Sequence, residues 1–263
     1  MHLDDIIAAK RAAWSGPRAA DAAARGRLNP VVPGRFAAAL SGPDVSVIAE
    51  IKPKSPSKGH LLDPELAVPT ARKYVAGGAS AVSVLGDTPY FGGSPELVRT
   101  VAEHPDITVP VLFKDFLVDT RQVRLAHDCG ADAVLVIVRA VDDVLLRDLV
   151  QTAHGLGIEA LVETFGQDEV DRALTANARV IGINNRDLAT FTVDLDNAAR
   201  LRRDIPRGVL TVSESGLSGR PDIDRIAVAG FDAALIGESL LSSPDPAAQV
   251  RSYAGVPILE VAS

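Results

Sequence analysis

A repeat of short apolar segments is the feature that most constrains the fold of this chain. Each segment is rich in Val, Ile and Ala and is followed by a polar or glycine-containing loop and then by an amphipathic stretch typical of a helix. The unit recurs about every 22–33 residues, as stacked strand–helix units do. The eight segments are residues 45–51, 81–85, 111–113, 133–138, 159–162, 180–183, 210–212 and 233–236.

Strands that alternate with helices predict a parallel sheet, and eight units in about 220 residues fit a closed (β/α)8 TIM barrel. We therefore expect an α/β protein in which residues 45–263 form one catalytic barrel domain. An open doubly wound sheet is the alternative. No G-x-G-x-x-G motif follows the first apolar segment, which disfavours that alternative.

Residues 1–44 precede the barrel, and we expect them to form an N-terminal helical extension that packs on it. Residues 4–14 read as one helix, with Ile6, Ile7 and the pair Lys10-Arg11 on different faces. Residues 35–40 predict a second, short helix. We expect this region to belong to the same single domain.

Composition and charge disfavour several classes of protein. A net charge of −7 lacks the basic excess of nucleic-acid-binding proteins, although a few lysines in one cleft can still bind an anionic metabolite. A single cysteine excludes an intramolecular disulfide, and the acidic N-terminus lacks the apolar segment of a secretion signal. The apolar segments are too short to span a membrane. We expect a cytoplasmic monomer without nucleic-acid or membrane partners.

Charged residues follow several apolar segments, where a barrel carries its chemistry. Glu50 and Lys52 are two residues apart, so they share one face of a strand and form either an ion pair or part of a site. Lys114 follows the third segment, and burial is expected to lower its pKa and suit it to proton transfer. Glu163 follows the fifth segment, where it could act either as a general base or as a helix cap.

The later segments lead into candidates for substrate binding. Asn184 and Arg186 can orient a hydroxyl or pair with an anion, although an Asn-rich turn is the alternative. Gly216 and Gly237 follow the seventh and eighth segments, where many barrels bind phosphate through backbone N–H groups. Glu238 beside that phosphate would repel it unless its side chain points away. The five histidines are scattered without metal-ligand spacing, so we expect no metal site.

These strand-end segments resemble the signature motifs of the indole-3-glycerol-phosphate synthase family of tryptophan biosynthesis. The matching segments are Glu50-Ile51-Lys52-Pro53-Lys54-Ser55-Pro56-Ser57, Lys114-Asp115-Phe116, Gly182-Ile183-Asn184-Asn185-Arg186-Asp187-Leu188 and Glu214-Ser215-Gly216, with weaker matches at 83–85 and 90–94. They occur in the family's order, one at each strand end, over about residues 45–243. The family's Thr-Glu after Leu85 is replaced here by Gly86-Asp87, which predicts a shorter polar side chain near the site.

The resemblance implies a carboxy-lyase that converts 1-(2-carboxyphenylamino)-1-deoxyribulose 5-phosphate to indole-3-glycerol phosphate, carbon dioxide and water without a cofactor. Lys114 would be the general acid at the substrate carbonyl, and Glu163 would handle the proton of the departing hydroxyl. The division of acid duty between Lys52 and Lys114 stays open. The implied catalytic set is Lys114, Glu163, Lys52, Glu50, Asn184 and Ser215. The implied substrate- and phosphate-binding set is Ser55, Arg186, Glu214, Gly216, Gly237, Phe91, Phe116 and Leu188, of which Phe91, Phe116 and Leu188 would line the pocket for the anthranilate ring.

Two other functions compete with this interpretation. A sugar-phosphate isomerase such as phosphoribosylanthranilate isomerase would need a Cys or an Asp pair at the strand ends, and the first strand end carries Glu50 and Lys52 instead. A non-catalytic or altered-substrate paralogue would keep the phosphate site and lose the acid–base residues. Lys52, Lys114 and Glu163 are all present, which disfavours that paralogue.

Overall fold

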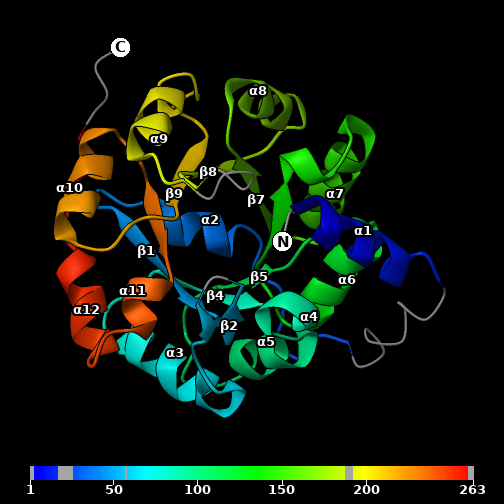
Figure 1. The fold of residues 1–263 in the computed structure, drawn as a ribbon, viewed down its shortest axis with the longest axis horizontal. Coiled ribbons are helices and arrows are strands. Elements are labelled where there is room, and N and C mark those ends of the chain that lie inside the picture. The colour runs from blue at the N-terminus through cyan, green and yellow to red at the C-terminus, as the bar shows by residue number, and fades with distance from the viewer. Residues whose placement is uncertain (1–2, 17–25, 57, 187–191, 260–263) are drawn as a thin grey trace.

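The computed structural model describes residues 3–16, 26–56, 58–186 and 192–259. Eight parallel strands close into a barrel in the order β1-β10-β9-β8-β7-β6-β5-β4, and helices surround it (Figure 1). The strands are β1 (Ser46–Ile51), β4 (Ala81–Leu85), β5 (Val111–Lys114), β6 (Ala133–Ile137), β7 (Glu159–Thr164), β8 (Val180–Asn184), β9 (Leu210–Glu214) and β10 (Ala233–Ile236). The predicted (β/α)8 barrel is confirmed, with one strand at each apolar segment.

A helix follows each barrel strand on the outside. These helices are α3 (Ala67–Ala76), α5 (Pro95–Ala102), α6 (Thr120–Asp128), α7 (Asp143–Gly155), α8 (Gln167–Thr175), α9 (Leu195–Arg202), α10 (Arg220–Val228) and α12 (Pro246–Tyr253). Side-chain caps define several starts; for example, the Leu97 N–H donates to Ser94 Oγ at 3.0 Å. Shorter elements lie in the loops: β2 (Lys54–Ser55), β3 (Gly59–His60), η2 (Pro64–Leu66), α4 (Thr88–Phe91), η3 (Val138–Ala140) and α11 (Glu238–Leu241).

Four strands extend beyond the apolar segments that predicted them. β5 includes Lys114, β7 includes Glu163, β8 includes Asn184 and β9 includes Glu214. The apolar pattern stops early at these positions because polar side chains enter the end of the barrel while the backbone continues in the sheet. The side chains expected at strand ends are therefore held by the strands' hydrogen-bond ladder.

The N-terminal extension contacts both ends of the barrel. We call the end formed by the carboxyl ends of the strands the mouth, and the opposite end the base. α1 (Leu3–Trp14) contributes Leu3 and Ile6 to a cavity at the mouth. α2 (Arg35–Leu40) buries Phe36 and Leu40 at the base, where the Ser46 hydroxyl at the start of β1 donates to the Ala39 carbonyl.

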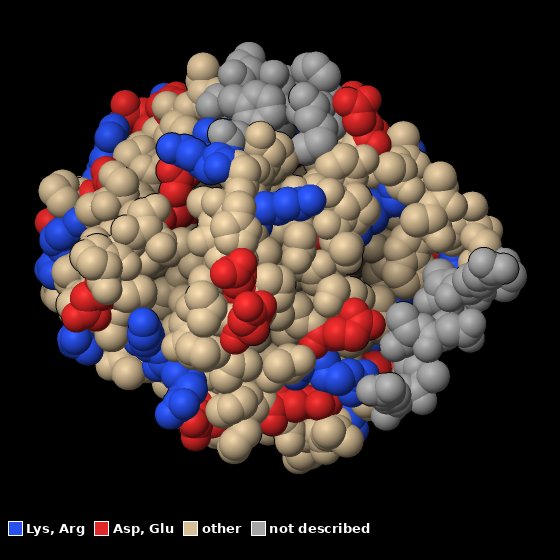
Figure 2. All heavy atoms as spheres, turned by 60° about the horizontal axis from the view of Figure 1, so that its bottom comes forward, with Lys and Arg blue, Asp and Glu red and all other residues tan. Residues whose placement is uncertain are grey.

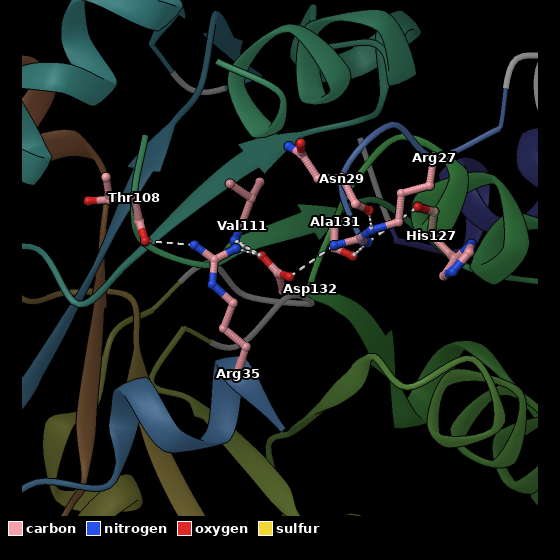
Figure 3. Close-up of polar contacts among 8 residues, drawn as sticks. All are labelled: Arg27, Asn29, Arg35, Thr108, Val111, His127, Ala131 and Asp132. Atoms are coloured by element: carbon pink, nitrogen blue, oxygen red, sulfur yellow. Dashed lines mark hydrogen bonds and ion pairs between the residues drawn. The ribbon is translucent and has the colours of Figure 1, made fainter. Parts of the chain in front are cut away.

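At the base, Asp132 receives two arginine side chains from the extension (Figure 3). Arg27 and Arg35 reach its two carboxylate oxygens at 3.2 Å and 3.0 Å. The guanidinium groups also donate to backbone carbonyls, Arg27 to Ala131 and Arg35 to Thr108. Asp132 in turn accepts the Val111 N–H at the start of β5. This base cluster, formed by Arg27, Arg35 and Asp132, attaches the extension to the sheet.

The surface carries charges of both signs. On the face drawn in Figure 2, acidic and basic side chains are interspersed in small groups among uncharged residues. Within the described ranges, no helix has the length and apolar character needed to cross a bilayer.

Candidate active site

A cavity of about 620 Å³ opens at the mouth of the barrel. Its lining comes from the ends of the barrel strands, the loops that follow them and helix α1. Twelve of the predicted site residues line it: Glu50, Lys52, Ser55, Phe91, Lys114, Phe116, Glu163, Asn184, Arg186, Ser215, Gly216 and Gly237. Glu214 is buried close to Lys114, and Leu188 lies outside the described residues.

Glu50 joins the two predicted lysines. Lys52 Nζ donates to one carboxylate oxygen at 2.6 Å, and Lys114 Nζ donates to the other at 2.8 Å. Burial alone would raise the pKa of Glu50, but the charges and hydrogen bonds of the two lysines outweigh it and hold this pKa at about 2. Glu50 is therefore ionised across the physiological range and fixes both ammonium groups in the cavity.

The expected lowering of the Lys114 pKa is wrong. Burial does oppose the charged form, but Glu50, Glu214 and Glu163 together raise the pKa of Lys114 above its ordinary value. These carboxylates belong to three different strands, so the sequence around Lys114 shows none of them. Lys114 is consequently protonated at neutral pH, which suits it to donate a proton rather than to accept one.

Two further buried carboxyl groups lie near Lys114. Burial raises the pKa of Glu163, against the opposing effects of Lys114 and of a hydrogen bond from the Asn184 side chain. Burial and the charge of Glu163 raise the pKa of Glu214 to about 8. Glu214 lies 3.7 Å from Lys114 Nζ, and neither of its carboxylate oxygens accepts a hydrogen bond within the described structure. Two carboxyl groups with raised pKa values thus flank one ammonium group, an arrangement typical of acid–base sites.

Glycines leave room for these carboxylates. A Cβ on Gly237 would lie 2.6 Å from Glu50 Oε1, and a Cβ on Gly182 would collide with the Glu214 carboxylate. Gly237, which the sequence predicted to bind phosphate, therefore also has to be small to leave room for Glu50, and the sequence did not indicate this second constraint. Both glycines are required by the packing of the site around Lys114.

The loops after β9 and β10 form one side of the cavity. Ser215 and Gly216 both have positive φ, 67° and 77°, and the Asn185 amide donates to the Ser215 carbonyl at 2.9 Å. A non-glycine residue at positive φ is uncommon, and backbone strain of this kind tends to cluster at functional sites. Glu238 follows Gly237 at the rim, where Lys58 pairs with its carboxylate at 3.1 Å and offsets its charge.

An apolar wall closes another side of the cavity. The rings of Phe91 and Phe116 lie 5.8 Å apart between centroids, tilted by 35°. Leu3 and Ile6 of α1 line the same cavity. Phe91 and Phe116 therefore line the cavity as a pair, while their role as a pocket for an aromatic ring stays a prediction. Helix α1 adds two lining residues that the sequence did not assign to the site.

Sequence reasoning missed a buried lysine beside this wall. Lys10 of α1 pairs with Asp87 at 3.0 Å and with Asp115 at 2.6 Å. The expectation that Lys10 and Ile6 occupy different faces of α1 is wrong, because residues three or four apart share a face. The spacing of Leu3, Ile6, Ile7 and Lys10 was the available signal, whereas nothing local to Asp87 or Asp115 identifies their distant partner.

The described residues contain no group of three or more His, Cys, Asp and Glu side chains arranged to hold a metal ion. Around Lys114 and Lys52 the site instead presents the carboxyl groups of Glu50, Glu163 and Glu214, with an aromatic pair and the glycine-containing loops after β9 and β10 at its sides. This combination can bind an anionic substrate with a planar ring and move protons on it.

Known proteins resemble this chain closely in sequence. The family model described as indole-3-glycerol phosphate synthase matches residues 11–253. The indole-3-glycerol phosphate synthase of Opitutus terrae is 44% identical over 84% of this chain and 85% of its own length. The protein of Streptomyces coelicolor named indole-3-glycerol phosphate synthase 2 is 46% identical over 84% of both chains.

Solved structures agree in fold at much lower identity. The 3-hexulose-6-phosphate synthase of Salmonella typhimurium has a TM-score of 0.66 at 17% identity and covers 80% of this chain and 96% of its own. At this identity the likeness concerns the barrel alone. The family model and the relatives above 40% identity settle the relationship: this chain belongs to the indole-3-glycerol phosphate synthase family.

Proposed function

We propose that this protein closes the indole ring of 1-(2-carboxyphenylamino)-1-deoxyribulose 5-phosphate and releases carbon dioxide, water and indole-3-glycerol phosphate. Family membership and the site geometry both support this activity. The observation that carries the proposal is the position of Lys114 Nζ, held 2.8 Å from Glu50 in the same cavity as the Phe91–Phe116 pair.

Ring closure needs an acid at the ketone of the substrate. The ring carbon that bears the carboxylate attacks the ketone carbon, and Lys114 donates a proton to the oxygen that becomes a hydroxyl. Loss of carbon dioxide then returns its bonding electrons to the ring and restores aromaticity. Because Glu50 fixes Lys114 from one side, the ammonium group can be oriented before the substrate arrives.

Dehydration needs a second proton-transfer group. The hydroxyl formed in the first step leaves as water after it gains a proton, and a proton is lost as the new double bond forms. Glu163 exchanges these protons, and its raised pKa and the Asn184 hydrogen bond support this role. Lys52 binds the substrate carboxylate or phosphate region, and its share of the acid duty with Lys114 stays open.

The two ends of the substrate bind to different groups of residues in the cavity. Ser215, Gly216 and Gly237 hold the phosphate in the loops after β9 and β10, and Ser55 and Arg186 belong to the same binding set. Phe91 and Phe116 hold the anthranilate ring. The assignment of Leu188 to that pocket stays a prediction, as do a monomeric state, a cytoplasmic location, the absence of a cofactor and the division into residues 1–44 and 45–263.

The direct test is the appearance of indole fluorescence when the protein is mixed with the substrate. We expect turnover by the wild type and a loss of about 10²–10⁴-fold in kcat/KM for Lys114→Ala, since that is the usual contribution of a general acid. Lys73→Ala, an exposed lysine of α3, is the matched control and should leave kcat/KM unchanged. A folded wild type that binds the substrate without converting it would favour a non-catalytic paralogue.

A further inference from the structure

Helix α1 presents a lysine within its barrel-facing apolar surface. Leu3, Ile6, Ile7 and Lys10 are three or four residues apart and therefore share one face of the helix. Ile6 and Ile7 are buried, and Leu3 and Ile6 line the cavity. The Lys10 side chain is only 11% exposed on that same face. A buried cation requires a compensating contact, so its partners decide where α1 can sit.

Those partners come from two neighbouring loops at the mouth. Asp87 follows β4 and Asp115 follows β5, and both carboxylates are buried. Lys10 Nζ lies 3.0 Å from Asp87 Oδ1 and 2.6 Å from Asp115 Oδ1. One ammonium group thus neutralises part of the charge of two carboxylates that would otherwise repel each other in a water-poor environment.

Each carboxylate also receives the backbone N–H of a residue in the aromatic wall. Phe91 donates to Asp87 Oδ2 at 3.0 Å, and Phe116 donates to Asp115 Oδ1 at 2.7 Å. Lys10 is therefore connected through one carboxylate to each of the two phenylalanines whose rings pack together. Lys10 itself does not line the cavity, so it acts on the substrate only through these neighbours.

We propose that Lys10 is a positioning residue of the active site, which fixes α1 and the spacing of Phe91 and Phe116 so that the pocket fits the planar ring of the substrate. This inference rests on the proposed function for the identity of that ring. It predicts that the charge of Lys10 affects how well substrate binds more than it affects the proton transfers at Lys114 and Glu163.

The test replaces Lys10 with Met, which keeps an unbranched side chain one atom shorter and removes its charge. We expect KM to rise about tenfold or more while kcat falls less, because ring binding is weakened in the ground state and in the transition state alike. Lys10→Arg should restore much of the wild-type KM. If Lys10→Met does not fold because its two buried carboxylates are left unpaired, the double variant Lys10→Met/Asp115→Asn removes one of these charges. The same measurement is then made on the double variant.

Arg35→Met is the matched control, since it removes a cation of the same extension at the base of the barrel, where Arg35 pairs with Asp132. The two variants are assayed at temperatures that lie the same number of degrees below the Tm of each. If Lys10 served only to attach the extension, Arg35→Met would then raise KM as much as Lys10→Met does. That result, or a KM for Lys10→Met within about twofold of the wild type, would overturn the inference.

Amide hydrogen exchange provides a readout that does not depend on turnover. The N–H groups of Tyr90, Phe91 and Phe116 should exchange faster in Lys10→Met and at the wild-type rate in Arg35→Met. Only Lys10→Met loosens the carboxylates of Asp87 and Asp115, which accept hydrogen bonds from these N–H groups. If the wild type converts no substrate, the proposed function fails while this exchange pattern still decides the role of Lys10. Unchanged exchange in Lys10→Met would refute that role.

Discussion

At the base of the barrel one carboxylate, Asp132, lies between two arginines, whereas at the mouth one lysine, Lys10, lies between two carboxylates. The arginines of the base also donate to backbone carbonyls, and Asp132 accepts a backbone N–H, so the base cluster is closed by hydrogen bonds (Figure 3). At the mouth, Glu214 keeps both carboxylate oxygens without hydrogen bonds inside the described structure. The polar groups of the base cluster are therefore satisfied within the fold, whereas Glu214 at the mouth is not.

The largest expected contrast comes from two glutamates on the same strand, β7. Glu163 at the mouth is assigned proton transfer, while Glu159 at the base accepts a 2.7 Å hydrogen bond from the ring of His154. We expect Glu163→Gln to lower kcat by about 10²–10⁴-fold with little change in Tm. Glu159→Gln should leave kcat unchanged and cost about 1–3 kcal/mol of unfolding free energy.

Steady-state kinetics and thermal unfolding of the two variants would decide this contrast. For a chain of this size, each kcal/mol corresponds to about 2–4 °C in Tm. A Glu159→Gln variant that loses activity as severely as Glu163→Gln would remove the distinction between the two ends of the barrel.

A smaller effect is expected from a methyl group at the mouth. In Gly237→Ala the new Cβ would displace the Glu50 carboxylate, and with it Lys52 and Lys114, so we expect a loss of about 10²-fold in kcat. Gly208 precedes β9 at the base and has open space where its Cβ would be, so Gly208→Ala should be nearly neutral. Equal kinetics for the two alanine variants would show that Glu50 tolerates displacement.

The smallest effect concerns the pH dependence of stability. Folding raises the pKa of Glu214 from an ordinary value near 4.5 to about 8, so between these values the folded state binds more protons than the unfolded state. The contribution of Glu214 to stability is therefore complete below pH 4.5 and is lost as the pH rises through 8. In Glu214→Gln, the fall in Tm between pH 5 and pH 8, measured by calorimetry, should be smaller than in the wild type by a few degrees. In Glu159→Gln the fall in Tm should match that of the wild type. Parallel Tm curves for wild type and Glu214→Gln would contradict the raised pKa.

The sequence was informative wherever the physical cause was local. Parallel strands covered by helices are buried on both faces, so they appeared as apolar segments, and Lys114 and Glu163 stood out because they interrupt that pattern. The raised pKa of Lys114 could not be predicted, because it depends on carboxylates from β1, β7 and β9. Lys10 was missed for a similar reason. Its partners lie in loops that only the closed barrel brings to α1.

The placement of Lys114, Glu163, Asn184 and Glu214 inside strands has a consequence for how such a protein can change. Their backbone positions are set by neighbouring strands, while the β2–β3 pair and the segment after β9 lie beyond the sheet. Insertions or exchanges in those loops can alter which molecule enters and how fast it leaves without moving the groups that transfer protons. Substrate range and reaction type can therefore diverge separately in this architecture, and efforts to redirect the enzyme should begin with the loops.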